Sequence, residues 1–113
     1  MIELPSHAAM TDYQRYIEQL EILHGWQDVD LIHNCFLLGE EMGELFKAIR
    51  RTEKLYLQAS ESTPEKEGVK KEVAEELVDV FNYLLALANR LDIDLEEAFR
   101  EKNAHNQKRT WLA

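Results

Sequence analysis

Two long stretches in which apolar residues recur every three or four positions constrain the fold of this chain more than any other feature. The first runs from about Val29 to Ile49, and the second runs from Thr63 to Leu91. This spacing gathers the apolar side chains on one face of an α-helix, whereas a half-buried strand requires strict alternation. Four glycines and two prolines are also too few for the turns of a β-sandwich or barrel. The sequence therefore predicts an all-α fold built around two long helices.

Shorter helices are predicted on either side of the long pair. Thr11 and Gln14 have the spacing of a capping box and are followed by a short periodic stretch. Asp94 and Glu97 have the same spacing and open the last helix. Long amphipathic helices joined by polar loops pack most simply as antiparallel neighbours. We therefore expect an antiparallel bundle of two long and two shorter helices.

Size, charge and cysteine content exclude several classes of protein. A chain of 113 residues suits one domain with a single core, so we expect residues 1–113 to form one domain. The net charge of −9 would repel nucleic-acid phosphates and anionic membrane surfaces. No apolar run is long enough for a membrane span or a signal-peptide core. The only cysteine, Cys35, forms no internal disulfide, which is typical of a reducing compartment. We expect a cytoplasmic protein that binds neither nucleic acid nor membranes.

Carboxylates interrupt the apolar face of both long helices. When each helix is wound at about 100° per residue, Glu41 falls among leucines and Glu76 falls among valines. Glu44 and Asp79 follow them by three residues and are their neighbours on the helix surface. In an antiparallel hairpin that turns near Ser60, midway between the two pairs, both pairs lie at one level. The sequence therefore predicts four converging carboxylates.

Converging carboxylates need a counter-charge, because each ion removed from water costs free energy and like charges repel. The second long helix places no basic residue on the face of Glu76 and Asp79, so a bound cation is the natural remedy. Oxygen ligands on rigid helices suit Mg²⁺, or Mn²⁺ as a substitute, and the absence of histidine disfavours zinc. The alternative is a solvated ladder of charges that includes Glu44, Lys47 and Arg51. That alternative explains Glu44 alone better than it explains four acids at one level.

These acids lie in two motifs that resemble those of the MazG-like, all-α nucleoside triphosphate pyrophosphohydrolases. The first motif, Gly39–Leu45, reads GEEMGEL, and the second, Glu75–Val80, reads EELVDV. A third element, Lys102-x-x-x-Asn106-x-x-Arg109, is similar to the family's C-terminal element. The resemblance covers nearly the whole chain, and it depends on the combination and order of the motifs.

The resemblance implies an enzyme that hydrolyses nucleoside triphosphates between the α and β phosphates. The products would be a nucleoside monophosphate and pyrophosphate, and substrates with a non-canonical base or a deoxyribose are among those allowed. It also implies that Mg²⁺ is held by Glu41, Glu44, Glu76 and Asp79. A homodimer or a dimer-based homotetramer is implied as well, and two long amphipathic helices leave apolar surface for that contact.

Two further acids are candidates for the general base of such a reaction. Glu40 stands beside the first acid pair, and Glu72 stands one turn before Glu76. Either carboxylate would be able to accept a proton from the attacking water. The sequence does not choose between them.

Basic and amide side chains are candidates for binding the substrate. Lys102, Asn106 and Arg109 share one face of the last helix, where an ammonium, an amide and a guanidinium suit phosphate oxygens. On their own, such basic residues equally complement the negative end of a helix dipole. Asn82, three residues after Asp79, is either a nucleotide contact or a solvated side chain.

Two alternative functions stay open at this point. Phosphoribosyl-ATP pyrophosphohydrolase belongs to the same superfamily. It is favoured less, because the residues after Asp79 lack the tyrosine–histidine pair expected of that enzyme. A non-catalytic helical module whose acidic face binds a basic partner is the other alternative. Such a module would show no Mg²⁺-dependent binding of nucleotides.

Overall fold

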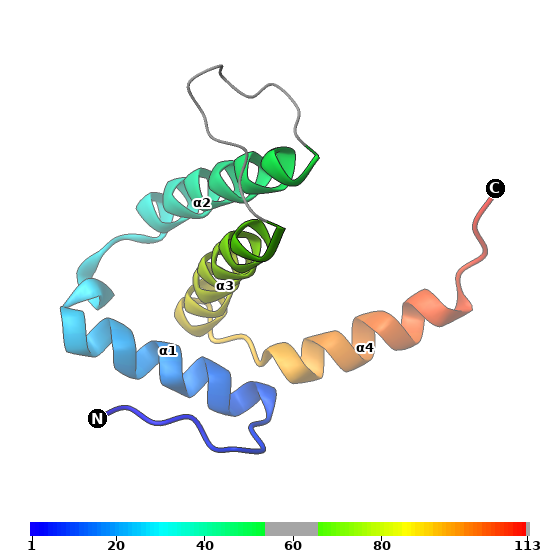
Figure 1. Ribbon diagram of the computed structural model, residues 1–113. Coiled ribbons are helices and arrows are strands. Elements are labelled where there is room, and N and C mark those ends of the chain that lie inside the picture. Colours follow the sequence, from blue (N-terminus) through cyan, green and yellow to red (C-terminus); the bar gives the residue numbers. More distant parts are fainter. Residues whose placement is uncertain (54–65, 113) are drawn as a thin grey trace. The chain divides into compact units, whose positions relative to one another are not determined.

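The fold consists of α-helices, as the sequence predicts. The computed structural model describes residues 1–53 and 66–112, and no β-strand occurs in these two ranges. The elements are α1 (Met10–His24), the 3₁₀ helix η1 (Trp26–Asp28), α2 (Leu31–Thr52), α3 (Lys66–Arg90) and α4 (Leu95–Lys108) (Figure 1). The two long and two shorter helices are therefore confirmed. The predicted turn near Ser60 and the helix start at Thr63 lie outside the described residues.

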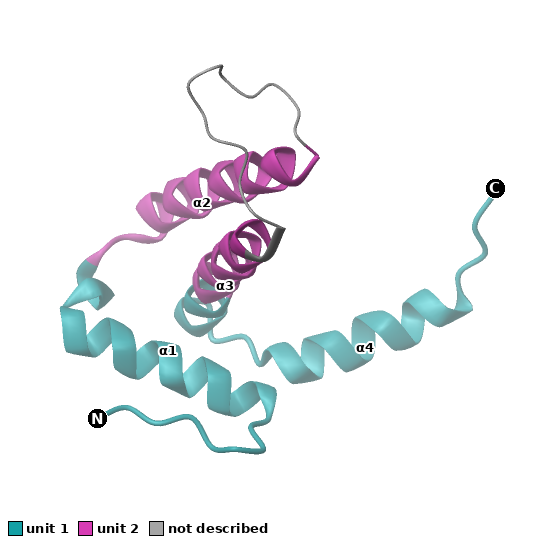
Figure 2. Cartoon of the chain, in the orientation of Figure 1, with its two compact units in different colours: residues 1–28, 85–113 teal, residues 29–84 magenta. Residues whose placement is uncertain are grey.

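The chain divides into two compact units (Figure 2). One unit, residues 29–84, contains α2 and the greater part of α3. The other unit, residues 1–28 and 85–113, contains α1, η1, the C-terminal part of α3 and α4. The expectation that residues 1–113 form a single domain stays a prediction.

In the unit of residues 29–84, α2 and α3 run antiparallel. Arg51, in the last turn of α2, pairs with Glu72, whereas Glu41, earlier in α2, meets Glu76, later in α3. Contacts closer to the start of α2 are therefore made closer to the end of α3, which is the order expected of an antiparallel hairpin. The buried apolar side chains of this unit are Leu45, Ala48 and Val69. Ala48, at 1% exposure, is the most buried of the three.

The N-terminus of α1 differs from the prediction. The helix begins at Met10, and the carboxylate of Asp12 accepts a hydrogen bond from the backbone N–H of Ala9 at 2.9 Å. The predicted capping box of Thr11 and Gln14 is therefore wrong. Gln14 cannot act as a cap because its side chain is buried and bonded elsewhere. Ala9 is the N-cap residue, and Asp12, three residues later, supplies the carboxylate that accepts from its N–H.

The starts of α2 and α4 are each fixed by an aspartate. The Asp94 carboxylate accepts from the backbone N–H of Glu97 at 3.2 Å, so the predicted cap of α4 is confirmed. The Asp30 carboxylate accepts from the backbone N–H of His33 at 2.8 Å. These bonds satisfy N–H groups that have no partner within the first turn of a helix.

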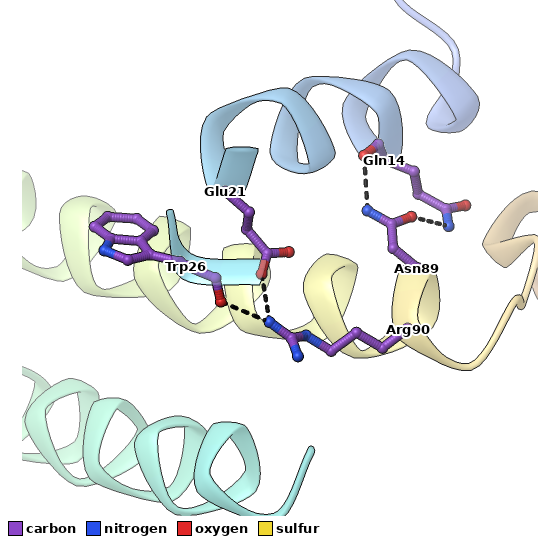
Figure 3. A network of polar contacts seen from close by, with 5 residues as sticks. All are labelled: Gln14, Glu21, Trp26, Asn89 and Arg90. Atoms are coloured by element: carbon purple, nitrogen blue, oxygen red, sulfur yellow. Dashed lines mark hydrogen bonds and ion pairs between the residues drawn. The ribbon is translucent and has the colours of Figure 1, made fainter. Parts of the chain in front are cut away.

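A network of amide groups joins three helices in the unit of residues 1–28 and 85–113, and Figure 3 shows the pair of Gln14 and Asn89 at its centre. The Nε2 of Gln14 donates to the Oδ1 of Asn89 at 3.0 Å and to the carbonyl of Ile93 at 2.9 Å. Its Oε1 accepts from the backbone N–H of Leu95 at 3.0 Å. The Nδ2 of Asn89 in turn donates to the backbone carbonyl of Gln14 at 2.8 Å. The network ties α1 to the end of α3 and to the first residue of α4.

A partly buried ion pair adds a second link between α1 and α3 (Figure 3). The Nη2 of Arg90 donates to the Glu21 carboxylate at 2.8 Å and to the carbonyl of Trp26 at 2.9 Å. The apolar core of this unit is formed by Ile17, Leu85, Ala86 and Ala88. None of the helices in the described ranges is long and apolar enough to cross a membrane.

Candidate metal centre

Three of the four predicted metal ligands meet between α2 and α3. Glu41 on α2 and the pair Glu76 and Asp79 on α3 each offer a carboxylate oxygen, and these oxygens lie within 4.8 Å of one another. Glu41 and Glu76 are partly buried, whereas Asp79 is exposed. The residues come together because the antiparallel helices bring their acids to one level, as the sequence analysis anticipates. We refer to these three residues as the acid cluster.

The acid cluster is electrostatically unfavourable on its own. Burial raises the pKa of Glu41, and the negative charges of Asp79 and Glu76, a hydrogen bond with Glu76 and the charge of Glu40 raise it further. One oxygen of Glu76, Oε2, is buried and accepts no hydrogen bond from the residues that the structure describes. A carboxylate whose charged form is disfavoured and a buried oxygen free to accept would both be stabilised by a positive group at this place.

A divalent cation fits this donor set. Three carboxylates supply only hard oxygen ligands, which Mg²⁺ and Mn²⁺ prefer. A cation placed among these oxygens would stabilise the ionised form of Glu41 and complete the coordination of the Glu76 oxygen. The partial exposure of the cluster also leaves room for water and for a substrate phosphate beside the ion. The chemistry of the residues therefore agrees with the predicted metal site.

Glu44 is not one of the three clustered residues. It lies one turn after Glu41 on α2, and its side chain is exposed. Glu40, a candidate general base, is exposed beside Glu41, and Asn82 lies partly buried on α3, three residues after Asp79. Their roles as ligand, base and nucleotide contact stay predictions.

Glu72, the other candidate base, takes part in an ion pair between the helices. The Nη1 of Arg51 donates to both of its oxygens, at 3.0 Å and 2.8 Å. The sequence alone places Arg51 only in a possible ladder of surface charges. Its position seven residues after Glu44, on the same side of α2, was the signal that it lies near the acids.

The predicted triphosphate clamp belongs to the unit that contains α4. Lys102 is exposed on α4, and Asn106 donates to Asn103 at 3.1 Å. Arg109 follows the helix as its C-cap with an extended backbone, so it does not continue the helical face of the other two as predicted. Its guanidinium instead lies 4.1 Å from the centre of the Trp111 ring, a cation–π contact. Substrate binding by these residues stays a prediction.

The fold is all-helical and two of its antiparallel helices share a carboxylate cluster, and sequence comparison identifies the family. The sequence model of the MazG nucleotide pyrophosphohydrolase domain matches residues 33–111, a range that contains the acid cluster. The chain belongs to this family, which confirms the predicted resemblance. It is also 27% identical over 101 residues to the uncharacterized protein YvdC of Bacillus subtilis (strain 168). That alignment covers 89% of this chain and 92% of YvdC.

Proposed function

We propose that the protein is a metal-dependent enzyme that hydrolyses a nucleoside triphosphate between its α and β phosphates. The products are a nucleoside monophosphate and pyrophosphate. Membership of the family supports nucleotide pyrophosphohydrolase activity in general. The observation that carries the more specific proposal is the acid cluster, in which Glu41, Glu76 and Asp79 each bring a carboxylate oxygen within 4.8 Å of the others.

In this proposal the acid cluster holds Mg²⁺, or Mn²⁺ as a substitute, and Glu44 provides a further carboxylate. When bound, the cation neutralises charge on the phosphoryl oxygens and makes the attacking water more acidic. The protein supplies the geometry. Glu76 and Asp79 are one turn apart on a single helix, so their spacing is fixed by α3 rather than by a loop.

Glu40 is the proposed general base. It is exposed next to Glu41, whereas both oxygens of Glu72 already accept hydrogen bonds from Arg51. In the proposed step, the water oxygen bonds to the α phosphorus and the bond from that phosphorus to the bridging oxygen breaks. The electron pair of that bond leaves with pyrophosphate, and the carboxylate of Glu40 accepts the proton. Glu72 as the base is the alternative.

Lys102, Asn106 and Arg109 are proposed to bind the triphosphate, with Asn82 contacting the nucleotide. Lys102 carries an exposed ammonium, and Arg109 presents a guanidinium fork suited to phosphate oxygens. Variants with Lys102→Gln or Arg109→Gln are expected to raise KM more than they lower kcat, because the two side chains bind the substrate in its ground state as well. An unchanged KM in both variants would remove the clamp from the proposal.

A second copy of the chain is the proposed partner. On the side of α2 opposite Glu41, the large exposed side chains of Phe36 and Phe46 flank Gly39 and Gly43. The order Phe-x-x-Gly-x-x-x-Gly-x-x-Phe reads the same in both directions, as a two-fold antiparallel contact between two α2 helices requires. Homodimers, or tetramers built from them, are therefore expected in light scattering. Phe36→Glu is expected to shift them towards the monomer.

The enzymatic proposal is tested by pyrophosphate release from a panel of ribo- and deoxynucleoside triphosphates, with Mg²⁺ or with EDTA. Glu41→Gln and Asp79→Asn are expected to abolish release while the helical circular dichroism is retained. Glu18→Gln, an exposed acid on α1, is the matched control and is expected to keep full activity. Activity confined to phosphoribosyl-ATP would favour that enzyme instead, and a folded protein without Mg²⁺-dependent nucleotide binding would favour a non-catalytic module.

A further inference from the structure

The ion pair between Arg51 and Glu72 has an unusual geometry. A guanidinium usually meets a carboxylate as a fork, with two nitrogens donating to two oxygens. Here one nitrogen, Nη1, donates to both oxygens of Glu72. The pair therefore uses a small part of the donor capacity of Arg51, which has five N–H groups on its guanidinium.

The rest of the Arg51 guanidinium is incompletely satisfied. Its Nε is buried and has no hydrogen-bond partner in the part of the chain that the structure describes. The side chain as a whole keeps 26% of its surface exposed. An arginine that served only to join two helices would gain more by presenting its fork to Glu72. The observed geometry instead suits an arginine held by one anion and able to accept a second.

The position of the pair indicates which anion that is. Glu72 precedes Glu76 by four residues on α3, which places the ion pair about 6 Å along the helix axis from Glu76, the nearest α3 member of the acid cluster. If one phosphate group of a polyphosphate lies at the cluster, its neighbouring phosphate groups would lie at a distance of this order from it. The guanidinium would then supply positive charge to the phosphate groups that lie beyond the metal site.

We propose that Arg51 binds the phosphate groups that leave as pyrophosphate and that Glu72 positions its guanidinium for this contact. The inference rests on the proposed function, because it assigns a subsite to the same substrate. It gives Glu72 a positioning role in place of a role as general base. It also adds to the site a residue that lies outside the C-terminal element, on the helix that supplies Glu41.

The test is the affinity of the full-length protein for inorganic pyrophosphate in the presence of Mg²⁺, measured by isothermal titration calorimetry. Arg51→Gln is expected to weaken the affinity about ten- to hundredfold, as expected for the loss of a charge-assisted hydrogen bond. Glu72→Gln is expected to weaken it several-fold, although binding of pyrophosphate requires no general base. Lys71→Gln removes the same charge from an exposed position next to Glu72 and is expected to bind as the wild type does.

Two further measurements separate this role from a structural one. Mg²⁺ affinity, titrated without pyrophosphate, is expected to be the same in Arg51→Gln and wild type. The double variant Arg51→Gln/Glu72→Gln leaves no unpaired charge, so it is expected to fold like the wild type and still to bind pyrophosphate weakly. Pyrophosphate affinity within twofold of wild type in Arg51→Gln and in the double variant would overturn the inference. If the wild type nevertheless hydrolyses nucleotides, the proposed function survives; if it releases no pyrophosphate from any nucleotide, both fail.

Discussion

The buried amide of Gln14 gives the sharpest prediction for stability. Its side chain is 8% exposed and makes three hydrogen bonds, to Asn89, to the carbonyl of Ile93 and from the backbone of Leu95. Gln14→Met keeps a side chain of similar length and volume but removes all three bonds. At about 0.5–1.5 kcal/mol for each bond, the free energy of unfolding is expected to fall by about 1.5–4.5 kcal/mol. This corresponds to a decrease in Tm of about 6–18 °C at ~4 °C per kcal/mol.

The assay is thermal and urea unfolding, followed by circular dichroism at 222 nm in EDTA and at a matched protein concentration. Gln19→Met on the same helix is the control, because Gln19 is exposed and its replacement is expected to change stability by less than about 0.5 kcal/mol. If Gln14→Met were no more destabilising than Gln19→Met, the three hydrogen bonds would contribute nothing measurable. The argument that this network joins α1, α3 and α4 would then be refuted.

A second substitution at the same position probes the polarity of the network. Gln14→Glu retains an oxygen to accept from the backbone of Leu95 but replaces the amide donor with an acceptor. That acceptor would face the Ile93 carbonyl and the Asn89 side-chain oxygen. A protonated carboxyl has one O–H to donate, so the Tm deficit of this variant is expected to shrink as the pH falls towards 4. A deficit independent of pH would contradict the assigned orientation of the amide.

Three further predictions concern the acid cluster and the helix ends. The pKa of Glu41 is raised in the folded protein, so its ionised form destabilises the metal-free protein. This destabilisation is fully present at pH values above the folded pKa, and it disappears as the pH falls below the pKa of an ordinary glutamate. In EDTA, Glu41→Gln is therefore expected to have a higher Tm than wild type at pH 7, with the gap closing towards pH 4; a lower Tm at pH 7 would contradict the account. Asp94→Ala removes the cap of α4 and is expected to cost about 1 kcal/mol in urea unfolding, against no change for the exposed Glu101→Ala. Gly25 ends α1 with φ +71°, so Gly25→Ala is expected to cost about 1 kcal/mol, and full stability in that variant would argue against a left-handed cap.

The acid cluster was predictable because it follows from local periodicity and one topological rule. Glu41 and Glu76 each occupy an apolar helix face, and an antiparallel hairpin brings them to one level. Exposure of Glu44 was harder to foresee. Residues three apart on a helix differ in direction enough for one to face the neighbouring helix and the other to face solvent.

The contacts of Gln14 and Arg51 with residues distant in sequence were not predictable from local patterns. Gln14 matched a capping box with Thr11, but its actual partners lie 75 or more residues away. Arg51 likewise looked like a surface charge until the hairpin placed Glu72 beside it. Local signals identify where a side chain stands on its helix, whereas its partner depends on how the helices pack.

The most direct test of the central claim is the identity of the products formed from a nucleoside triphosphate. Nucleoside monophosphate and pyrophosphate are measured together by ion-exchange chromatography and phosphorus NMR, with Mg²⁺ and with EDTA, for wild type and Glu41→Gln. The account predicts equimolar monophosphate and pyrophosphate from the wild type with Mg²⁺, and neither product with EDTA or from Glu41→Gln. Formation of nucleoside diphosphate and inorganic phosphate, or turnover that persists in Glu41→Gln, would contradict it.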